Sequence, residues 1–329
     1  MRSWGSWVRF ATLALVWGSS FLWIKIALGA LSPVQLAFAR LALGAATLVV
    51  LCLATRTRLP HDWRVWLRIG LPAVLGNAVP FILFGVGERT VSSGVAGVLN
   101  ATTPLWALLI ALVIRSERRP GWLRLTGLLL GFVGTLVIFA PWQQSGLASW
   151  GALACLIAAL SYAISYTYIG RYLVGTVSPI AMSGAQLSLA TGLTAVSLPF
   201  GGLDAIHLTG AMPVVAVAIL GIFGTGIAFA LNNRLIADEG ATTASTVGYL
   251  LPVVSVGLGA LALHEPLSVR VLIGMAVVLV GIALSRRKAG STHAVVVRPA
   301  GDRSPSETVR SGSTSASSEA RWTRASPRS

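Results

Sequence analysis

The sequence predicts an all-α polytopic membrane protein, with ten transmembrane helices arranged as two inverted five-helix repeats. The first observation is composition: of 329 residues, 55% are hydrophobic and 11% are charged, whereas a soluble domain carries about 25% charged residues. The second is the presence of ten apolar stretches of the length that crosses a bilayer as a helix, about 20 residues each. The third is that the pattern of the first five stretches recurs in the last five.

The ten predicted helices follow one another with short connections. They run over about residues 10–29, 33–54, 68–87, 93–113, 122–141, 149–169, 179–199, 213–235, 241–263 and 268–286. The alternation of apolar and polar residues that is typical of a membrane β-barrel is absent from them. The first stretch resembles a signal peptide, but Lys25 inside it and its place in the repeat favour a permanent helix.

The net charge of +15 lies almost entirely in the loops and tail. If the N-terminus is cytoplasmic, the cytoplasmic connections up to the last span carry Arg2, Arg9, Arg56, Arg58, Arg64, Arg68, Arg115, Arg118, Arg119, Arg124, Arg171, Arg234, Arg286, Arg287 and Lys288. The outer connections carry only Arg89 and Arg270. This asymmetry follows the positive-inside rule, so we expect a multi-pass protein of the cell membrane with both termini cytoplasmic, and no nucleic-acid partner.

The two halves of the chain match at nearly the same interval. Ser32-Pro33 matches Ser178-Pro179, Gly76 matches Gly224, and the segment from Trp17 to Phe21 matches Tyr162 to Tyr166. We therefore predict a first repeat over 1–144, a second over 145–288, and a disordered basic Ser/Arg-rich cytoplasmic tail over 289–329. Because five is odd, the second repeat must cross the membrane in the opposite sense, an architecture that recurs in secondary transporters.

Four stretches carry a family resemblance. WGSSFLWIKIAL, LSPVQLAFARLALGAATLVV, LNATTPLWALLIALVIRSER and YLLPVVSVGLGALALHEPLSVRVLIGMAVVLVGIAL resemble the ten-helix EamA-type members of the drug/metabolite transporter superfamily. The resemblance covers residues 10–286 and implies transport of small organic solutes, often export. The two loops where family members often have a bulky residue before Glu differ here, reading Ser116-Glu117 and His264-Glu265-Pro266.

Two cations inside predicted spans are candidate site residues, because ionisable groups are costly in a bilayer. Lys25 either neutralises an anionic group of the substrate or extends its ammonium to the outer interface. Arg40 lies deeper and keeps its charge, so it either contacts substrate or pairs within the protein.

Uncharged and aromatic groups supply the rest of the predicted binding surface, since hydrogen-bonding groups at this depth must face protein or a wet cavity. Interhelical hydrogen bonding is the alternative for each of them. These candidates are Trp17, Ser20, Asn77, Asn100, Tyr162, Tyr166, Gln186, Asn232 and Tyr249.

Four further residues are predicted to have gating or structural roles. Pro104 and Pro252 either bend their helices as hinges or occupy tolerated positions near helix starts. Glu117 and Glu265 lie between successive helices, where a carboxylate is favoured by the next helix dipole or takes part in gating or proton coupling.

The sequence favours a secondary transporter that exports small organic metabolites, amino-acid-like or drug-like, by alternating access between the two halves. It offers no GxxxxGK[ST] loop for an ATP-driven pump, and no catalytic carboxylate pair, metal cluster or cofactor motif for an enzyme. A flippase for a lipid-linked substrate is the first alternative and a channel is the second. The predicted partners are a small organic solute and membrane lipid; protons as coupling ion and a homodimer are left open.

Overall fold

In the computed structural model, the described residues are 4–91, 93–115, 121–143, 149–200, 202, 205–207, 210–263 and 268–286. Within these ranges all regular structure is helical and no strand occurs. The predictions for Glu117, Glu265 and the tail from residue 289 lie outside the described residues.

The first half of the chain forms helices over each of its predicted spans, although the first and third begin earlier than expected and the fourth is divided into two. They are α1 (Trp4–Leu28), α2 (Pro33–Ala54), α3 (Trp63–Ala73), α4 (Val79–Gly87), α5 (Ser93–Asn100), α6 (Thr103–Val113) and α7 (Trp122–Phe139). Between α3 and α4 the helix continues as a π-helical turn at Val74–Ala78. Pro72, near the end of α3, lacks the amide proton that a regular α-helix would use.

The second half repeats this order. Its helices are α8 (Trp150–Tyr168), α9 (Pro179–Ser197), α10 (Met212–Gly221), α11 (Ala228–Glu239), α12 (Ala241–Ser245), α13 (Val247–Leu263) and α14 (Val269–Ser285). A π-helical turn at Ile222–Ile227 joins α10 to α11, and another at Ile169–Leu173 follows α8. The π turns between α3 and α4 and between α10 and α11 contain the matched glycines Gly76 and Gly224.

Serine hydroxyls begin several of these helices, as their position before an apolar run predicts. Ser32 and Ser178 each accept a hydrogen bond from a backbone N–H in the first turn of α2 and α9, and in both helices a proline occupies the first turn. The Ser32 N–H in turn donates to Gln35 Oε1 at 2.8 Å, which completes a capping box. The two Ser-Pro pairs of the repeat therefore perform the same structural task.

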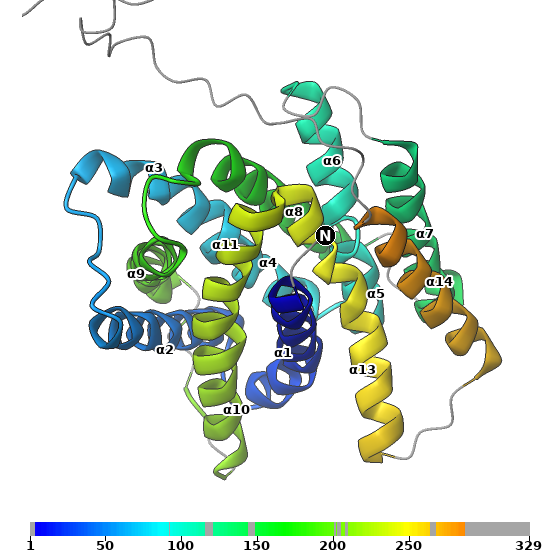
Figure 1. The fold of residues 1–329 in the computed structure, drawn as a ribbon. Helices are drawn as coiled ribbons and strands as arrows, with labels where there is room; N and C mark the ends of the chain where they lie inside the picture. The colour runs from blue at the N-terminus through cyan, green and yellow to red at the C-terminus, as the bar shows by residue number, and fades with distance from the viewer. Residues whose placement is uncertain are drawn as a thin grey trace, which may run out of the picture. The chain divides into compact units, whose positions relative to one another are not determined.

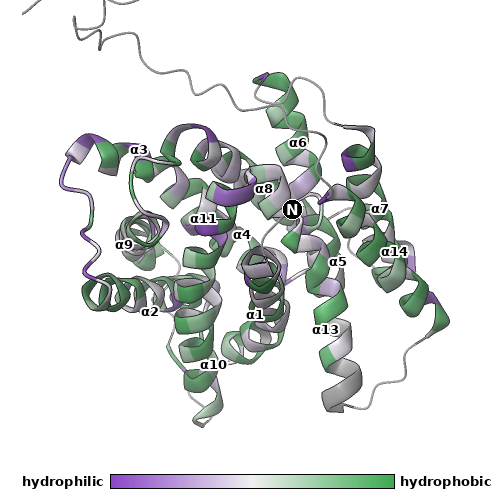
Figure 2. Ribbon diagram, viewed as in Figure 1, coloured by the Kyte–Doolittle hydropathy of each residue, from purple (hydrophilic) through white to green (hydrophobic). Residues whose placement is uncertain are grey.

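The helices are apolar enough for a membrane. Among the described residues, seven helical stretches of at least 18 residues qualify, over 4–28, 33–54, 63–87, 95–113, 122–143, 150–173 and 212–239, and shorter apolar helices cover 241–254 and 269–285. Large apolar side chains face outward along them, including Val50, Val113, Leu129, Val196 and Val280. Figure 2 shows hydrophobic residues along the bodies of the helices. The chain is therefore a polytopic helical membrane protein.

Two pairs of matched helices pack antiparallel, each pair side by side in Figure 1. A Cβ on Gly184, near the start of α9, would lie 3.7 Å from Cys52 Sγ, near the end of α2. A Cβ on Gly281, late in α14, would lie 2.7 Å from the carbonyl oxygen of Gly127, early in α7. The glycines let the backbones of α7 and α14 approach closely.

Ionic contacts join helix ends at one face of the bundle, which we call the N-terminal face. Arg286, at the end of α14, donates to Glu239 Oε1 at 2.9 Å and to Ser6 Oγ at 3.3 Å. Arg9 donates to Asp238 Oδ2 at 2.7 Å. At the opposite face, the turn after α1 accepts a hydrogen bond on the Ala30 carbonyl from His207 N–H.

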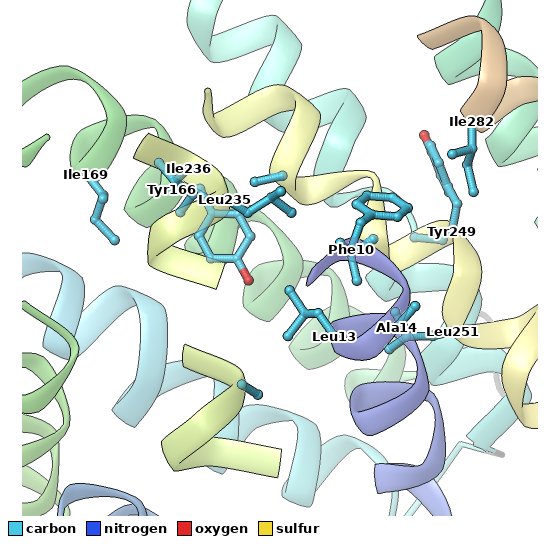
Figure 3. Close-up of a cluster of buried hydrophobic side chains, with 14 of the residues drawn as sticks. Phe10, Leu13, Ala14, Tyr166, Ile169, Leu235, Ile236, Tyr249, Leu251 and Ile282 are labelled. Carbon is cyan, nitrogen blue, oxygen red and sulfur yellow. The ribbon is translucent and has the colours of Figure 1, made fainter. Parts of the chain in front are cut away.

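A cluster of apolar side chains lies beneath the N-terminal face, shown in Figure 3. It includes Phe10, Leu13 and Ala14 from α1 and further side chains from the second half of the chain. The labelled members from that half are Tyr166, Ile169, Leu235, Ile236, Tyr249, Leu251 and Ile282. We call these ten labelled residues the apolar plug.

Candidate functional site

A cavity of about 110 Å³ lies within the helix bundle and is lined from both halves of the chain. This volume is similar to the roughly 150 Å³ of an engineered protein cavity that binds benzene. Its lining runs from Phe229, Ser245 and Leu251 in the interior to Pro33 and Glu88, near the opposite-face ends of α2 and α4. Tyr166 and Leu251 belong both to this lining and to the apolar plug.

Aromatic rings form much of the cavity wall. Trp17 packs edge-to-face on Phe229 with ring centroids 5.9 Å apart, and Phe229 packs in the same way on Phe81 at 6.2 Å. Phe84 stacks on Tyr162 at 6.0 Å. Because these rings contact one another as well as the cavity, they form a stiff apolar surface on which a planar or apolar group can rest.

Arg40 supplies the positive charge of the cavity lining. Its guanidinium lies 4.0 Å above the centroid of the Phe81 ring, a cation–π contact. Its Nε donates to Thr225 Oγ1 at 3.2 Å, in the π turn between α10 and α11. These two contacts orient a charged fork that can bind a carboxylate through two N–H groups.

Glu88 supplies a negative charge to the same lining. It caps the end of α4 and is close enough to Arg40 for the two charges to interact. Because Glu88 directly precedes Arg89, the sequence suggests a surface ion pair between the two. That interpretation does not predict that Glu88 lines the cavity. The cavity therefore presents both charges beside an aromatic wall.

Six of the predicted site residues come together around this cavity. They are Trp17, Ser20, Arg40, Asn100, Tyr162 and Tyr166. Trp17 also donates its indole N–H to the Gly224 carbonyl at 3.0 Å, so the π turn between α10 and α11 is tied to α1 at the cavity edge. Asn100 is the last residue of α5, directly before the break that separates α5 from α6.

Gln186 and Asn77 lie together in a buried hydrogen-bond network instead. Gln186 Nε2 donates to Asn77 Oδ1 at 2.6 Å, and Asn233 Nδ2 donates to Gln186 Oε1 at 3.2 Å. Asn233 also donates to Ser183 Oγ at 2.8 Å. The network joins α9, α11 and the π turn between α3 and α4.

The other candidates occupy varied places. Asn232 is fully buried on α11, beside Tyr166. Tyr249 is fully buried in the apolar plug, with its ring packed over Gly131. The backbone of Lys25 belongs to α1, and its side chain lies outside what the structure describes.

The two prolines differ in their helices. Pro104 occupies the first turn of α6, after the break at residues 101–102, which fits the interpretation of a proline tolerated at a helix start. Pro252 lies inside α13, where it removes one backbone donor.

Several lining residues were not predicted from the sequence. Phe81, Phe84 and Phe229 line the cavity, as do Thr103 and Ser245. A phenylalanine within a membrane span gives no signal of this role, because most such residues face lipid or core. Among the described residues, no group of three or more His, Cys, Asp or Glu side chains gathers to hold a metal ion.

The fold and cavity define a polytopic membrane protein with an internal cavity. The model of the EamA-like transporter family matches the chain twice, over residues 6–140 and 149–287. The chain therefore belongs to this family, within the drug/metabolite transporter superfamily, and is a membrane transporter.

Individual relatives agree with this assignment. An "uncharacterized transporter" of Archaeoglobus fulgidus is 29% identical over 86% of this chain and 99% of its own length. The "uncharacterized inner membrane transporter YedA" of Escherichia coli is also 29% identical, over 75% of this chain and 79% of its own. A solved crystal structure with 23% identity covers 87% of this chain and 99% of its own, with a TM-score of 0.71, and so has the same fold.

Proposed function

We propose that this protein is a secondary carrier that exports small organic solutes across the cell membrane. In this proposal two inverted halves, residues 1–144 and 145–288, exchange conformations and expose the central cavity alternately to the two faces. The observation that carries the proposal is a cavity lined from both halves, together with matched contacts that matched elements make.

Antiparallel packing supports the inverted arrangement. In an inverted repeat, a helix and its match in the other half must run in opposite directions. The pairs α2 with α9 and α7 with α14 pack in this way. With α9, the paired α12 and α13, and α14 added to the seven longer stretches, the proposed number of spans is ten.

Matched side-chain contacts support it further. Arg40 and Gln186 each follow the proline of a Ser-Pro pair by the same interval, and Thr225 and Asn77 each follow a matched glycine. Arg40 donates to Thr225 at 3.2 Å and Gln186 donates to Asn77 at 2.6 Å. Exchanging the halves converts one hydrogen bond into the other, as a two-fold relation requires.

The chemistry of the lining supports a small amphipathic substrate. Arg40 can bind an anionic group, Glu88 can bind a cationic one, and the rings of Trp17, Phe84 and Tyr162 can pack on an apolar body. An amino-acid-like or drug-like solute carries such groups. Positive residues concentrated at the N-terminal face support a cytoplasmic location for both termini.

Counterflow in proteoliposomes of the purified protein tests the proposal. Labelled amino acids, nucleobases and cationic dyes are offered to vesicles that contain the unlabelled compound, with and without a pH gradient. Saturable counterflow of one class is the expected result and identifies the substrate class. Folded protein that gives no counterflow, but moves a labelled lipid between leaflets, contradicts the proposal in favour of a flippase.

A further inference from the structure

Buried amide and hydroxyl groups gather outside the cavity, on the side chains of Asn77, Ser165, Gln186, Asn232 and Asn233. Each of these five residues is at most 1% exposed. Gln186 bonds to Asn77 and to Asn233, and the Ser165 hydroxyl lies against Gly76 beside Gln186 Nε2. We call these five residues the amide cluster. It joins the π turn between α3 and α4 to α8, α9 and α11.

The amide cluster has more polar atoms than partners. Asn77 Nδ2, Ser165 Oγ and Asn233 Oδ1 have no hydrogen-bond partner among the described protein groups. Buried polar atoms are normally hydrogen-bonded, because leaving them unpaired costs free energy. A group of them in one place indicates that water or a ligand completes their bonds in at least one conformation.

The repeat relates the amide cluster to the cavity wall. Gln186 and Asn77 correspond to Arg40 and Thr225, as described above. Ser165 corresponds to Ser20, because both lie three residues after the matched Trp17 and Tyr162. Ser165 Oγ lies against Gly76 just as Ser20 Oγ lies 3.1 Å from the position of a Cβ on Gly224. The repeat therefore relates the amide cluster, residue by residue, to the part of the cavity wall that carries Arg40 and Ser20.

The amide cluster and the matching part of the cavity wall differ in their exposure to the cavity. Ser20 and Arg40 line the cavity, whereas the amide cluster lies apart from it. Between the cavity and the N-terminal face stands the apolar plug, and the Arg286–Glu239 and Arg9–Asp238 ion pairs join helix ends at that face. On α11, Asn233 faces α9 and Asn232 lies beside Tyr166 of α8, so exposing both amides requires α11 to move relative to α8 and α9.

We infer that the amide cluster is a second half-site for the transported solute, which lines the cavity when the carrier opens to the N-terminal face. This inference rests on the proposed function. The two half-sites differ in chemistry, since Gln186 stands where the other has the cation Arg40. An anionic group of the solute meets a guanidinium in one conformation and neutral amide donors in the other, so the two faces bind it with different strength.

Matched single-cysteine variants test the inference. In a background with Cys52→Ala and Cys155→Ala, Ser20→Cys and Ser165→Cys report on the two half-sites. A membrane-impermeant methanethiosulfonate reagent is applied to right-side-out spheroplasts and to inside-out vesicles. Arg58→Cys and Arg89→Cys, both exposed, identify the N-terminal and opposite faces respectively.

We expect Ser20→Cys to react from the opposite face and Ser165→Cys to react only from the N-terminal face. If the conformation of Figure 1 predominates, Ser165→Cys should react at roughly 0.1–10% of the rate of Ser20→Cys, the usual population of a minor conformation. Adding Glu239→Gln, which removes the carboxylate that Arg286 bonds, should raise the rate at Ser165→Cys and lower the rate at Ser20→Cys.

Two results would overturn the inference while wild-type counterflow persists. One is reaction of Ser165→Cys from the same face as Ser20→Cys. The other is no reaction from either face by a variant with the wild-type elution profile. If Ser165→Cys does not fold, Asn232→Cys replaces it, because Asn232 belongs to the same cluster and is fully buried. Absence of wild-type counterflow contradicts the proposed function instead.

Discussion

Arg40 is the residue on which substrate charge should depend most. Replacing it with glutamine keeps a hydrogen-bonding side chain but removes the charge. Charge-assisted hydrogen bonds contribute about 1.5–3 kcal/mol, so the KM for an anionic solute should rise roughly tenfold to a hundredfold. Concentration-dependent counterflow measures this change. A neutral solute of similar shape should be affected less.

Thr225→Val provides the matched control for Arg40→Gln. It removes the acceptor of the Arg40 Nε hydrogen bond and leaves the guanidinium and its contact with Phe81 in place. We expect a smaller rise in KM, with the preference for anionic solutes retained. Equal KM values for the anionic solute in wild type and Arg40→Gln would contradict a binding role for Arg40.

Residue types predicted part of the site. A cation inside a span is rare and costly, and this rule identifies Arg40 without a structure. The same rule applied to amides identifies both Asn100, at the cavity, and Gln186, in the amide cluster, because depth in the membrane does not tell which helix face is turned to a cavity. Neither Phe81 nor Glu88 could be assigned to the cavity in this way. Phe81 resembles its lipid-facing neighbours in the sequence, and Glu88 lies beside the cation Arg89 at a helix end.

At the scale of elements, the contact between α7 and α14 depends on glycine. A Cβ on Gly281 would lie 2.7 Å from the Gly127 carbonyl oxygen, so Gly281→Ala must push the helices apart. Overpacking costs about 1–3 kcal/mol, and we expect a lower Tm in detergent. Gly192→Ala in α9 is the control, because a Cβ there meets nothing within 4 Å. It should leave Tm unchanged or raise it, given the helix propensity of alanine. Equal Tm values for the two variants would contradict the close contact.

The Arg286–Glu239 ion pair is the second interaction between elements that invites a test. Its side chains are 1% and 5% exposed, so Glu239→Gln leaves a buried cation with one charged partner fewer. Removing one member of a buried pair costs about 3–5 kcal/mol. The expected result is a clear fall in Tm, measured by thermal unfolding in detergent.

Asp238→Asn is the control on the neighbouring, more exposed pair with Arg9. Those side chains are 28% and 29% exposed, and exposed pairs contribute about 0–1 kcal/mol. A fall in Tm for Asp238→Asn as large as that for Glu239→Gln would show that the contribution of these ion pairs to stability does not depend on their exposure.

The helices themselves were largely predictable, because apolar length and Ser-Pro starts fix where a span begins and ends. The expected start of α2 at Pro33 and that of α9 at Pro179 both agree with the structure. The π turns at Val74–Ala78 and Ile222–Ile227 were not foreseen, since an apolar sequence looks the same in α and π geometry. Only Pro72, Gly76 and the glycines of Ile222–Ile227 hint at them, and these residues also occur in regular membrane helices.

At the scale of the whole molecule, the ten-span proposal depends on helices that composition alone identifies weakly. The 19-residue helix α9 is one of them, since it contains Gln186, Ser183 and two threonines. It packs along α2, and Gly202, just beyond the short helical turn Leu198–Phe200 that follows α9, accepts a hydrogen bond from Gln35 near the start of α2. These contacts place the two ends of α9 at different faces of the bundle.

Cysteine accessibility at the two ends of α9 tests this proposal. Thr176 and Ala205 are both exposed, and in the cysteine-free background Thr176→Cys and Ala205→Cys should react with an impermeant reagent from opposite sides of the membrane. We expect Thr176→Cys to react from the cytoplasmic side, because Arg171 and the other loop cations favour that side. If both positions react from one side, α9 does not span the membrane. The second half then has an even number of crossings, and alternating access between inverted halves fails together with the two-fold relation between Arg40 and Gln186.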